Sequence, residues 1–342
     1  MHHIKVAGIA AIAAFGVAAT AQADEWKFAL EEIEGSVQDM YAQEFKRIVE
    51  EASGGDIEVT IYPYGQLGTS ADLTELAQSG VVQLTFASPG HLGTLIPEVQ
   101  VFSLHYLLSQ NNDVNKEFLG SSPTIYEGLA GDFADHGLRL ITMFPEGEMV
   151  WTTNREIHSP ADFDNFKMRT MVSPMLVAAY EALGASPTPM PYGEVYGGLQ
   201  LGMIDGQVNP IFAIQEMKFY EVVDYMIFAG QQQFTTTVVA GLDWFDGLSP
   251  EHQALVTDSQ AELLDYIYAT QEAMNAERLE MIIADRPELT VIHLTAEERE
   301  AFREASLGAR EDFAEMVGPS GEEILNSVVA EIEALEAEHG AE

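Results

Sequence analysis

The sequence contains no cysteine, which excludes disulfide bonds and thiolate chemistry. Basic residues are also scarce, because 15 lysines and arginines stand against 55 aspartates and glutamates and give a net charge of −40. A surface of this charge repels nucleic acid phosphates and anionic lipids, so neither is an expected partner. The hydrophobic fraction of 47% argues against disorder despite the charge. The composition therefore predicts a folded, acidic protein.

Sequence signatures of catalysis and of cofactor binding are missing as well. The chain has no G-x-S-x-G, G-K-[ST], G-x-G-x-x-G or H-E-x-x-H motif. Its nine histidines are scattered and lack the spacing of metal ligands. We therefore expect no cofactor, no metal and no enzymatic activity, although a catalytic group assembled from distant residues stays open.

Only the N-terminal residues 1–23 combine an apolar run with export features. Lys5 precedes the uncharged stretch 6–19, and Ala21-Gln22-Ala23 closes the segment. These are the charged region, the apolar region and the A-x-A cleavage site of a secretory signal peptide. The apolar stretch is shorter than the roughly 20 residues that a membrane-spanning helix needs, although an uncleaved anchor is the alternative. We expect residues 24–342 to form a mature periplasmic protein without direct membrane insertion.

Strands and helices alternate along the first part of the mature chain. Strand patterns cover Trp26–Leu30, Ile57–Tyr62 and Val81–Ala87. A helical pattern over Ser36–Ala52 separates the first two, and a short helix that ends near Gly80 separates the second from the third. This alternation predicts an α/β domain with a largely parallel sheet.

A very long helix is predicted in the C-terminal third of the chain. Ser249-Pro250 is a typical helix start, and the helical pattern continues to about Asp285, shortly before Pro287. A helix of about 35 residues spans roughly 50 Å at 1.5 Å per residue. That length exceeds one domain, and the mature chain is long enough for two, so we expect the helix to run across both.

The stretch Phe166–Pro210 carries the main functional signal. Arg169 stands in the apolar strand Phe166–Met171, in a chain that has only nine arginines. A guanidinium can bind a carboxylate through two parallel hydrogen bonds, which lysine cannot do. We interpret Arg169 as a candidate for binding a small anion-bearing solute, with a surface strand arginine as the alternative.

A second candidate lies at the end of the first predicted strand. Glu31 and Glu32 close that strand, and by alternation Glu32 shares a face with Trp26 and Phe28. Ligands of open α/β sheets sit at the carboxyl ends of the strands. Glu32 is therefore a candidate partner for a ligand cation, with a solvated surface carboxylate as the alternative.

Three further candidates offer an amide or an aromatic ring. Asn209 follows a short predicted strand, where its side chain provides both a donor and an acceptor. The alternative for Asn209 is a turn residue before Pro210. Tyr192 and Phe234 are candidates for lining a ligand site, with ordinary core packing as the alternative.

The chain resembles the periplasmic solute-binding subunits of TRAP transporters (tripartite ATP-independent periplasmic transporters). The resemblance runs through nearly the whole mature chain and is densest in Tyr64–Gly68, Lys167–Arg169, Gly184–Pro189, Gly193–Tyr196 and Asp205–Pro210. It implies a two-domain α/β fold of the type II-like periplasmic solute-binding class, with an inter-domain ligand cleft and a long domain-spanning helix. It also implies a small-molecule solute that is handed to TRAP membrane permease subunits.

This resemblance also gives expected domain bounds. After a signal peptide at residues 1–23, the first domain comprises 24–147 plus about 236–275. The second domain comprises 148–235 plus about 276–342.

Within the family, the chain is most similar to the ectoine and 5-hydroxyectoine binders. The supporting segments include Leu30–Glu32, Val37–Asp39, Ser88–Gly90, Leu95–Pro97, Phe144–Met149, Gly193–Gly198 and Phe234–Thr236. The resemblance implies that Arg169 binds the ligand carboxylate and that Asn209 hydrogen-bonds it. It also implies that Glu32 pairs with the delocalised cation of the ectoine ring and that Phe234 packs on that ring.

The chain departs from the ectoine binders at three positions. It has His91, Tyr192 and Ala213 where those proteins have an aromatic, a tryptophan and an aromatic residue. The aromatic enclosure of a cation is therefore thinner, since cation–π contact is best with tryptophan. We expect a zwitterionic solute of the ectoine type, with a small hydroxylated carboxylate or sulfonate, bound through His91 and Tyr192, as the runner-up. An exported hydrolase or isomerase with Glu32 or His91 as its base is the less favoured alternative.

Overall fold

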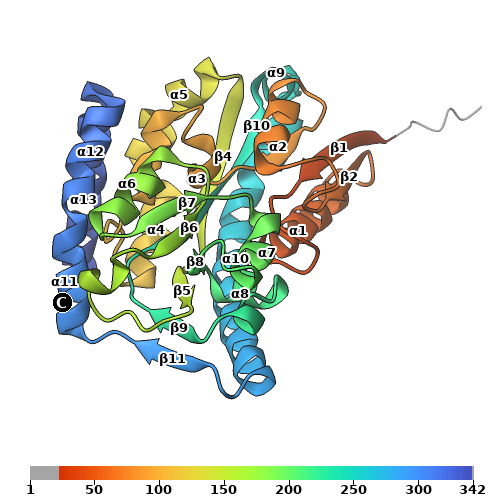
Figure 1. The fold of residues 1–342 in the computed structure, drawn as a ribbon. Coiled ribbons are helices and arrows are strands. Elements are labelled where there is room, and N and C mark those ends of the chain that lie inside the picture. Colours follow the sequence, from red (N-terminus) through yellow and green to blue (C-terminus); the bar gives the residue numbers. More distant parts are fainter. Residues whose placement is uncertain (1–22, 341–342) are drawn as a thin grey trace, which may run out of the picture.

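The computed structural model describes residues 23–340 as an α/β fold with two β-sheets (Figure 1). The first sheet has the strand order β2-β1-β3-β10-β4, and the second has the order β11-β9-β5-β8-β6-β7. The strands are β1 Asp24–Ala29, β2 Ile57–Tyr62, β3 Leu84–Phe86, β4 Leu138–Glu148, β5 Val150–Thr153, β6 Lys167–Thr170, β7 Ser186–Pro189, β8 Gly206–Asn209, β9 Tyr225–Phe228, β10 Gln233–Gly241 and β11 Thr290–His293. The predicted α/β class with two units is confirmed.

Helices cover both sheets. The longer ones are α1 Val37–Ala52, α2 Ser70–Gln78, α4 Asn112–Ser121, α6 Pro174–Ala182, α10 Pro250–Asp285, α11 Ala296–Ser306, α12 Gly308–Val317 and α13 Pro319–His339. The shorter ones are α3 Pro89–Leu92, η1 Pro97–Ser103, η2 Thr124–Gly128, α5 Ala130–Asp135, η3 Pro160–Phe163, η4 Tyr192–Glu194, α7 Val195–Gln200, α8 Ile211–Glu216, η5 Phe219–Val222 and α9 Leu242–Gly247.

The first sheet is parallel in one part and antiparallel in the other. Strands β2, β1 and β3 run parallel, as the alternation of strands and helices predicts. Strand β10 lies between β3 and β4 and is antiparallel to both. Strands β2, β1, β3 and β4 therefore share one direction, so the prediction of a largely parallel sheet is confirmed, with β10 as the exception. This strand returns from the second sheet, so its direction does not follow from the local alternation.

Each sheet is buried on both faces. In β1, Trp26 and Phe28 enter one hydrophobic cluster, whereas Ala29 enters the other. In β5, Trp151 and Val150 likewise divide between the two clusters of the second sheet. Such alternation between two apolar faces is expected for strands covered by helices on both sides. The middle of each strand is therefore apolar on both faces, and polar side chains that could bind a ligand are expected at the strand ends, where the sheets meet.

The long helix α10 connects the two sheets, as predicted. Its first turn is capped by the Ser249 hydroxyl, which accepts a hydrogen bond from the His252 backbone N–H at 3.2 Å. The helix packs against α1 and β4 of the first sheet and against α8, which follows β8 of the second sheet. In Figure 1 it runs from α9 down to the turn that leads into β11.

The C-terminal helix bears on the expected division into domains. Leu325 and Val328 of α13 enter the same hydrophobic cluster as Phe118 and Phe133, which cover the first sheet. The domain bounds stay a prediction, and these contacts favour a first domain that also contains residues 319–339.

The predicted signal peptide lies outside the described residues except for Ala23. Within residues 23–340, none of the helices combines the length and the apolar character that crossing a membrane requires.

Candidate functional site

A cavity between the two sheets brings together all six residues that the sequence analysis selects as ligand-binding candidates. Its volume is about 30 Å³, and its lining residues are Glu31, Glu32, Gln38, His91, Arg169, Met171, Tyr192, Asn209 and Phe234. Elements of the first sheet contribute Glu32, His91 and Phe234, whereas β6 and β8 of the second sheet contribute Arg169 and Asn209. The cavity thus lies where an inter-domain cleft is expected.

The cavity continues on both sides. Beyond His91 and Tyr192 it meets a larger cavity of about 200 Å³, which is also lined by Tyr64, Thr69 and Thr94. On the other side, next to Arg169 and Asn209, a cavity of about 10 Å³ reaches towards Tyr180 and Val208. Together they form a path from the interior towards the rim of the cleft.

Arg169 is a buried cation. Its neighbours in β6 are apolar or small, and the residue is 1% exposed. Its Nε and Nη2 atoms donate hydrogen bonds to the Met190 carbonyl at 3.0 and 2.7 Å. No carboxylate of residues 23–340 lies within 4.0 Å of its guanidinium nitrogens. Arg169 therefore keeps donors for a ligand anion, and the alternative of a surface arginine is wrong.

Burial affects the protonation of Arg169 without removing its charge. The loss of solvation lowers its pKa to about 10, and the nearby hydroxyls of Tyr192 and Tyr64 act in the opposite direction. The guanidinium is thus protonated at neutral pH. A buried charge of this kind is stabilised by a hydrogen-bonded partner of opposite charge.

The two glutamates after β1 are buried, although not as the strand alternation predicts. The strand ends at Ala29, and Glu31 and Glu32 lie in the bend that follows. Their exposed fractions are only 5% and 6%, so they are not solvated surface carboxylates. The end of β1 thus places Glu31 and Glu32 near the cavity, and the bend after the strand directs both side chains into the interior.

Glu31 and Glu32 differ in their partners. The Glu31 carboxylate accepts a hydrogen bond from the Ser88 backbone N–H and contacts His91 Nδ1, both at 2.9 Å. Burial opposes ionisation of Glu31, but His91 and Ser88 outweigh it and lower its pKa. The hydrogen bond that Glu32 accepts from the Gln38 backbone N–H is long, at 3.3 Å, and no cationic side chain of residues 23–340 lies within 4.0 Å of its carboxyl oxygens. Glu32 is thus the carboxylate that remains available to a ligand cation.

Further carboxylates stand close to Glu32. Burial, followed by the charge of Glu146 and a hydrogen bond to it, raises the pKa of Glu32 well above its ordinary value. Burial also raises the pKa of Glu146 to about 7, although its hydrogen bonds to Glu32 and Gln38 act against this shift. Burial and the charge of Glu32 raise the pKa of Glu216 as well. One side of the cavity therefore has a concentration of buried carboxyl groups that resist simultaneous ionisation.

Tyr192, Asn209 and Phe234 complete the lining. The Tyr192 hydroxyl donates a hydrogen bond to Glu216 Oε1 at 3.0 Å. The rings of Tyr192 and Tyr64 pack edge to face, with their centroids 5.9 Å apart. Asn209 Nδ2 donates to Gln207 Oε1 at 2.5 Å. Tyr192 also packs against the hydrophobic core, as its alternative interpretation expects, and its part in ligand binding stays a prediction.

Phe234 lies at an irregular point of the first sheet. It pairs with Gly147 of β4, next to a register shift between Phe234 and Thr235. Such a bulge redirects a side chain, and here the ring of Phe234 lines the cavity.

Five residues near the site are not predicted from the sequence: Glu31, Gln38, Glu146, Met171 and Glu216. Glu146 has a detectable signal, because it is a carboxylate that closely follows the apolar residues Met143 and Phe144 within β4. Glu216 has none, since an acidic residue at the end of a short helix is common in this chain. Ala213, by contrast, is 3% exposed within a hydrophobic cluster and is not among the residues that line the cavity.

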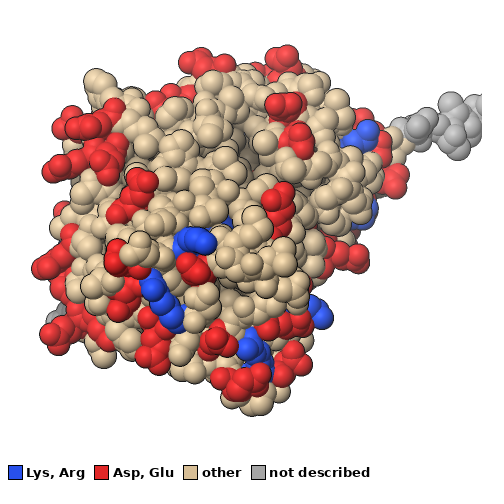
Figure 2. All heavy atoms as spheres, in the orientation of Figure 1, with Lys and Arg blue, Asp and Glu red and all other residues tan. Residues whose placement is uncertain are grey.

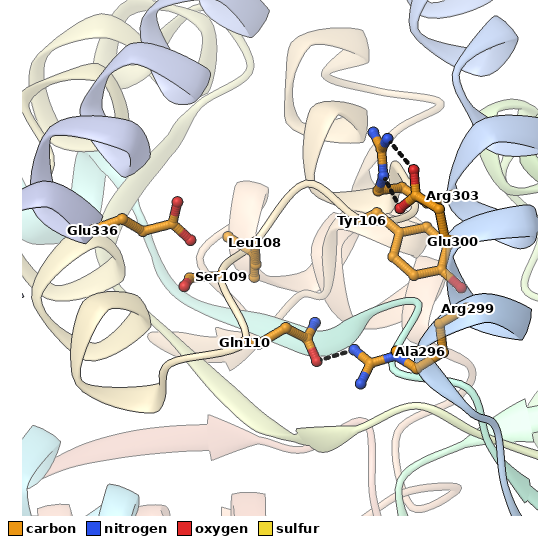
Figure 3. Close-up of a pocket in the computed structure, with 9 residues that line it drawn as sticks. All are labelled: Tyr106, Leu108, Ser109, Gln110, Ala296, Arg299, Glu300, Arg303 and Glu336. Carbon is orange, nitrogen blue, oxygen red and sulfur yellow. Dashed lines mark hydrogen bonds and ion pairs between the residues drawn. The ribbon is translucent and has the colours of Figure 1, made fainter. Parts of the chain in front are cut away.

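A larger cavity, of about 300 Å³, lies away from this site, between the 106–110 loop, α11 and α13 (Figure 3). Its two arginines already have partners. Arg303 donates two hydrogen bonds to Glu300, at 2.7 and 2.5 Å, and Arg299 bonds to the side chain of Gln110. A ligand there would compete with existing pairs, which makes the cavity at Arg169 the better candidate. Within residues 23–340, no three or more acidic or histidine side chains are arranged to hold a metal.

Similarity to known proteins identifies the family. Residues 28–315 match the family described as bacterial extracellular solute-binding protein, family 7, also called DctP. The chain belongs to this family. It is 44% identical to the ectoine-binding periplasmic protein TeaA of Halomonas elongata over 94% of each chain. It is also 44% identical to the ectoine/5-hydroxyectoine-binding periplasmic protein UehA of Ruegeria pomeroyi, over 95% of this chain and 96% of that protein.

A solved structure agrees with this family. The periplasmic ectoine-binding protein of the TeaABC TRAP transporter of Halomonas elongata superimposes with a TM-score of 0.88 at 44% identity. The match covers 91% of this chain and 100% of the solved one. As a DctP family member, the chain is a solute-binding protein that acts outside the cytoplasm, which confirms the expected role and the periplasmic location. The family and these relatives are binding proteins rather than enzymes.

Proposed function

We propose that this DctP family protein is the receptor of a TRAP transporter and that it binds a small zwitterionic compatible solute of the ectoine type. In this role it delivers the solute to the membrane permease subunits. The support comes from the two relatives named for ectoine and from the fold shared with the TeaABC binding protein.

The observation that carries the proposal is the separation of charge across one small cavity. Among residues 23–340, the buried cation of Arg169 has no carboxylate partner, and the buried carboxyl group of Glu32 has no cationic partner. A ligand with a carboxylate at one end and a delocalised cation at the other neutralises both. Leaving either charge unpaired in a dry site costs several kcal/mol, so a zwitterion has a large advantage.

Each lining residue then has a part in binding. Arg169 holds the ligand carboxylate, assisted by the amide of Asn209. Glu32 pairs with the ligand cation, and the rings of Phe234 and Tyr192 pack against the ligand ring. His91 Nδ1 pairs with the Glu31 carboxylate at 2.9 Å, so Glu31 is not expected to bind the ligand cation.

The second candidate ligand is a small hydroxylated carboxylate or sulfonate. It is favoured by the polar atoms of His91 and Tyr192 and by the adjoining 200 Å³ cavity, whose lining includes Thr69 and Thr94. Electrostatics disfavour this ligand class, because an anion that carries no cationic group would be repelled by Glu32 and by the carboxylates behind it.

Titration calorimetry of the ligand-free protein tests the proposal. Ectoine and 5-hydroxyectoine are compared with a panel of small carboxylates and sulfonates. We expect one ectoine molecule to bind per protein molecule, with a Kd in the micromolar range or below. Binding of another acid without binding of ectoines would overturn the ligand assignment, and chemical conversion of a solute would support an exported enzyme instead.

The variant Glu32→Gln separates the two ligand classes. Removing one partner of a buried charge pair typically weakens binding by about 2–5 kcal/mol, which is roughly 30-fold to several thousand-fold. We expect a loss of this size for a zwitterion and little loss, or a gain, for a plain anion. Glu58→Gln, which removes an exposed carboxylate from β2, is the matched control. Equal effects of the two variants on ectoine binding would contradict the assigned role of Glu32.

A further inference from the structure

Gln38 of α1 holds three glutamates in fixed positions. Its backbone N–H donates to Glu32 Oε2 at 3.3 Å, and its Nε2 donates to Glu146 Oε1 at 3.1 Å. Its side-chain oxygen accepts a hydrogen bond from the Glu31 backbone N–H at 2.9 Å. Gln38 is 0% exposed, so this arrangement is shielded from water. The carboxyl groups of Glu32 and Glu146 are therefore held close together in the interior.

Glu146 has no cationic partner among the described residues. It is 0% exposed, and its Oε2 atom lacks a hydrogen-bond partner within residues 23–340. Two carboxylates that share a buried site do not both ionise readily, because the like charges repel and neither is solvated. A proton between Glu32 and Glu146 relieves that repulsion and satisfies the free oxygen.

The charged groups around this pair already have other partners. Glu31 is bound to His91. Glu216 accepts from Tyr192 and is attracted by Arg278 of α10.

Among the residues that the structure describes, the elements packed behind the pair supply no free cation. On α1, Asp39 accepts a hydrogen bond from the Gly35 backbone N–H at 2.8 Å, and Tyr41 is kept neutral by burial. On α10, the uncharged Asn275 donates to the Glu146 backbone carbonyl at 2.9 Å, and burial keeps Tyr268 neutral.

We propose that Glu146 is a positioning residue that sets ligand specificity by sharing one proton with Glu32, and that an arriving ligand cation displaces this proton. The proposal rests on the proposed function, since it requires a cationic group at Glu32. The proton leaves for the solvent, and the ligand cation takes its place beside the ionised pair. A plain anion brings no charge that can displace the proton, so it binds without releasing one.

The direction of the pH dependence follows from the raised pKa values of the pair. In the free protein, the shared proton is bound below about pH 7, the value to which burial raises the pKa of Glu146. A ligand cation lowers the pKa of the pair. Proton release is therefore about half a proton at this pH and approaches one proton below it. Affinity for a zwitterion rises with pH through the same range, by at most tenfold per pH unit for one proton.

Titration calorimetry with ectoine, in buffers of equal pH but different ionisation enthalpy, counts the released protons. We expect the wild type to release about half a proton at pH 7, close to one proton about a pH unit lower, and less at higher pH. Glu146→Gln keeps the hydrogen-bonding shape but removes the shared proton. It should release far fewer protons and show an affinity that is nearly independent of pH.

Glu216→Gln is the matched control, because it removes another buried carboxylate on the same side of the cavity. The Glu216→Gln variant should release as many protons as the wild type on binding ectoine, even if its affinity for ectoine differs. A merely structural Glu146 would predict weaker binding at every pH with an unchanged proton count. That result, or ectoine binding by the wild type without proton release, would overturn the proposal.

A second measurement separates this proposal from the identity of the ligand. Potentiometric titration of the ligand-free wild type and of Glu146→Gln should differ by one proton that dissociates near pH 7. If ectoine does not bind, the proposed function fails, and this difference still decides whether the pair shares a proton. A difference that appears only near pH 4.5, the ordinary value for a glutamate, would overturn the sharing.

Discussion

Arg169 brings a positive charge into the interior with one backbone carbonyl as its partner. The Met190 carbonyl accepts two hydrogen bonds from the guanidinium and fixes its orientation towards the cavity. A fixed guanidinium binds a carboxylate with little loss of side-chain entropy, because its N–H donors are already oriented. At the scale of the residue, this preorganisation is the basis of anion binding.

The variant Arg169→Met tests this role. It should weaken binding of any carboxylate ligand by about 2–5 kcal/mol, because the buried anion then lacks its partner. The free energy of unfolding should change by only about 1 kcal/mol, since removing an unpaired buried charge offsets the lost hydrogen bonds. Titration calorimetry and chemical denaturation measure the two effects.

The control for this variant is Arg155→Met, which removes an exposed arginine that donates a hydrogen bond to the Asp164 carbonyl. Its ligand affinity should equal that of the wild type. Wild-type affinity in Arg169→Met as well would rule out the assigned role of Arg169.

Individual residues also show how far sequence reasoning extends. An arginine in an apolar strand is a sufficient signal for Arg169, because a buried guanidinium is rarely accidental. The position of Glu32 near a strand end is likewise readable. The partnership of Glu32 with Glu146 is not, because 114 positions of chain separate them and only the packing of β4 beside α1 brings them together.

At the scale of the element, the β-bulge between β4 and β10 shapes the site. Gly147 has a φ of +137°, a conformation that side-chain-bearing residues rarely adopt. A Cβ atom at Gly147 would lie 2.6 Å from Nδ2 of Asn275, a residue of α10 that also bonds to the Glu146 carbonyl. The glycine thus lets the long helix approach the strand that carries Glu146 and faces Phe234.

Gly147→Ala should lower the free energy of unfolding by about 1–3 kcal/mol, because backbone strain and the displacement of Asn275 act together. Chemical denaturation measures the change. Gly131→Ala is the matched control, since Gly131 lies in α5 with no atom within 4 Å of its would-be Cβ. It should be neutral or stabilising by up to about 1 kcal/mol. Equal stabilities of the two variants would contradict this account of the bulge.

Elements defined by local signals are the ones that the sequence predicts well. The helix from Pro250 to Asp285 follows from its cap and its apolar pattern, and α11 begins at a capping box that Thr295 and Glu298 form. The place of β10 is not predictable in this way. Its pairing with β3 and β4 depends on the route of the chain back from the second sheet, which no local pattern encodes.

At the scale of the whole molecule, the dominant property is the net charge of −40. In the orientation of Figure 2, acidic residues are spread around the outline of the molecule, whereas basic residues are few. A compact chain of this charge is destabilised by repulsion between its own carboxylates.

Salt should therefore stabilise the fold. Raising the ionic strength from 0.1 to 1 M shortens the screening length from about 10 to about 3 Å. We expect the midpoint of thermal unfolding to increase by several degrees over this range of sodium chloride. The same measurement in sucrose of equal osmolality controls for general solute effects. A midpoint that stays constant or falls with salt would show that charge repulsion is unimportant to stability.

The central claim is that one cavity pairs a ligand carboxylate with Arg169 and a ligand cation with Glu32. Determining the crystal structure of the protein with ectoine tests it most directly. The account predicts carboxylate oxygens at about 2.7–2.9 Å from the Arg169 guanidinium and the cationic ring beside Glu32, against the face of Phe234. Ectoine bound elsewhere, or with its carboxylate directed away from Arg169, would contradict the account.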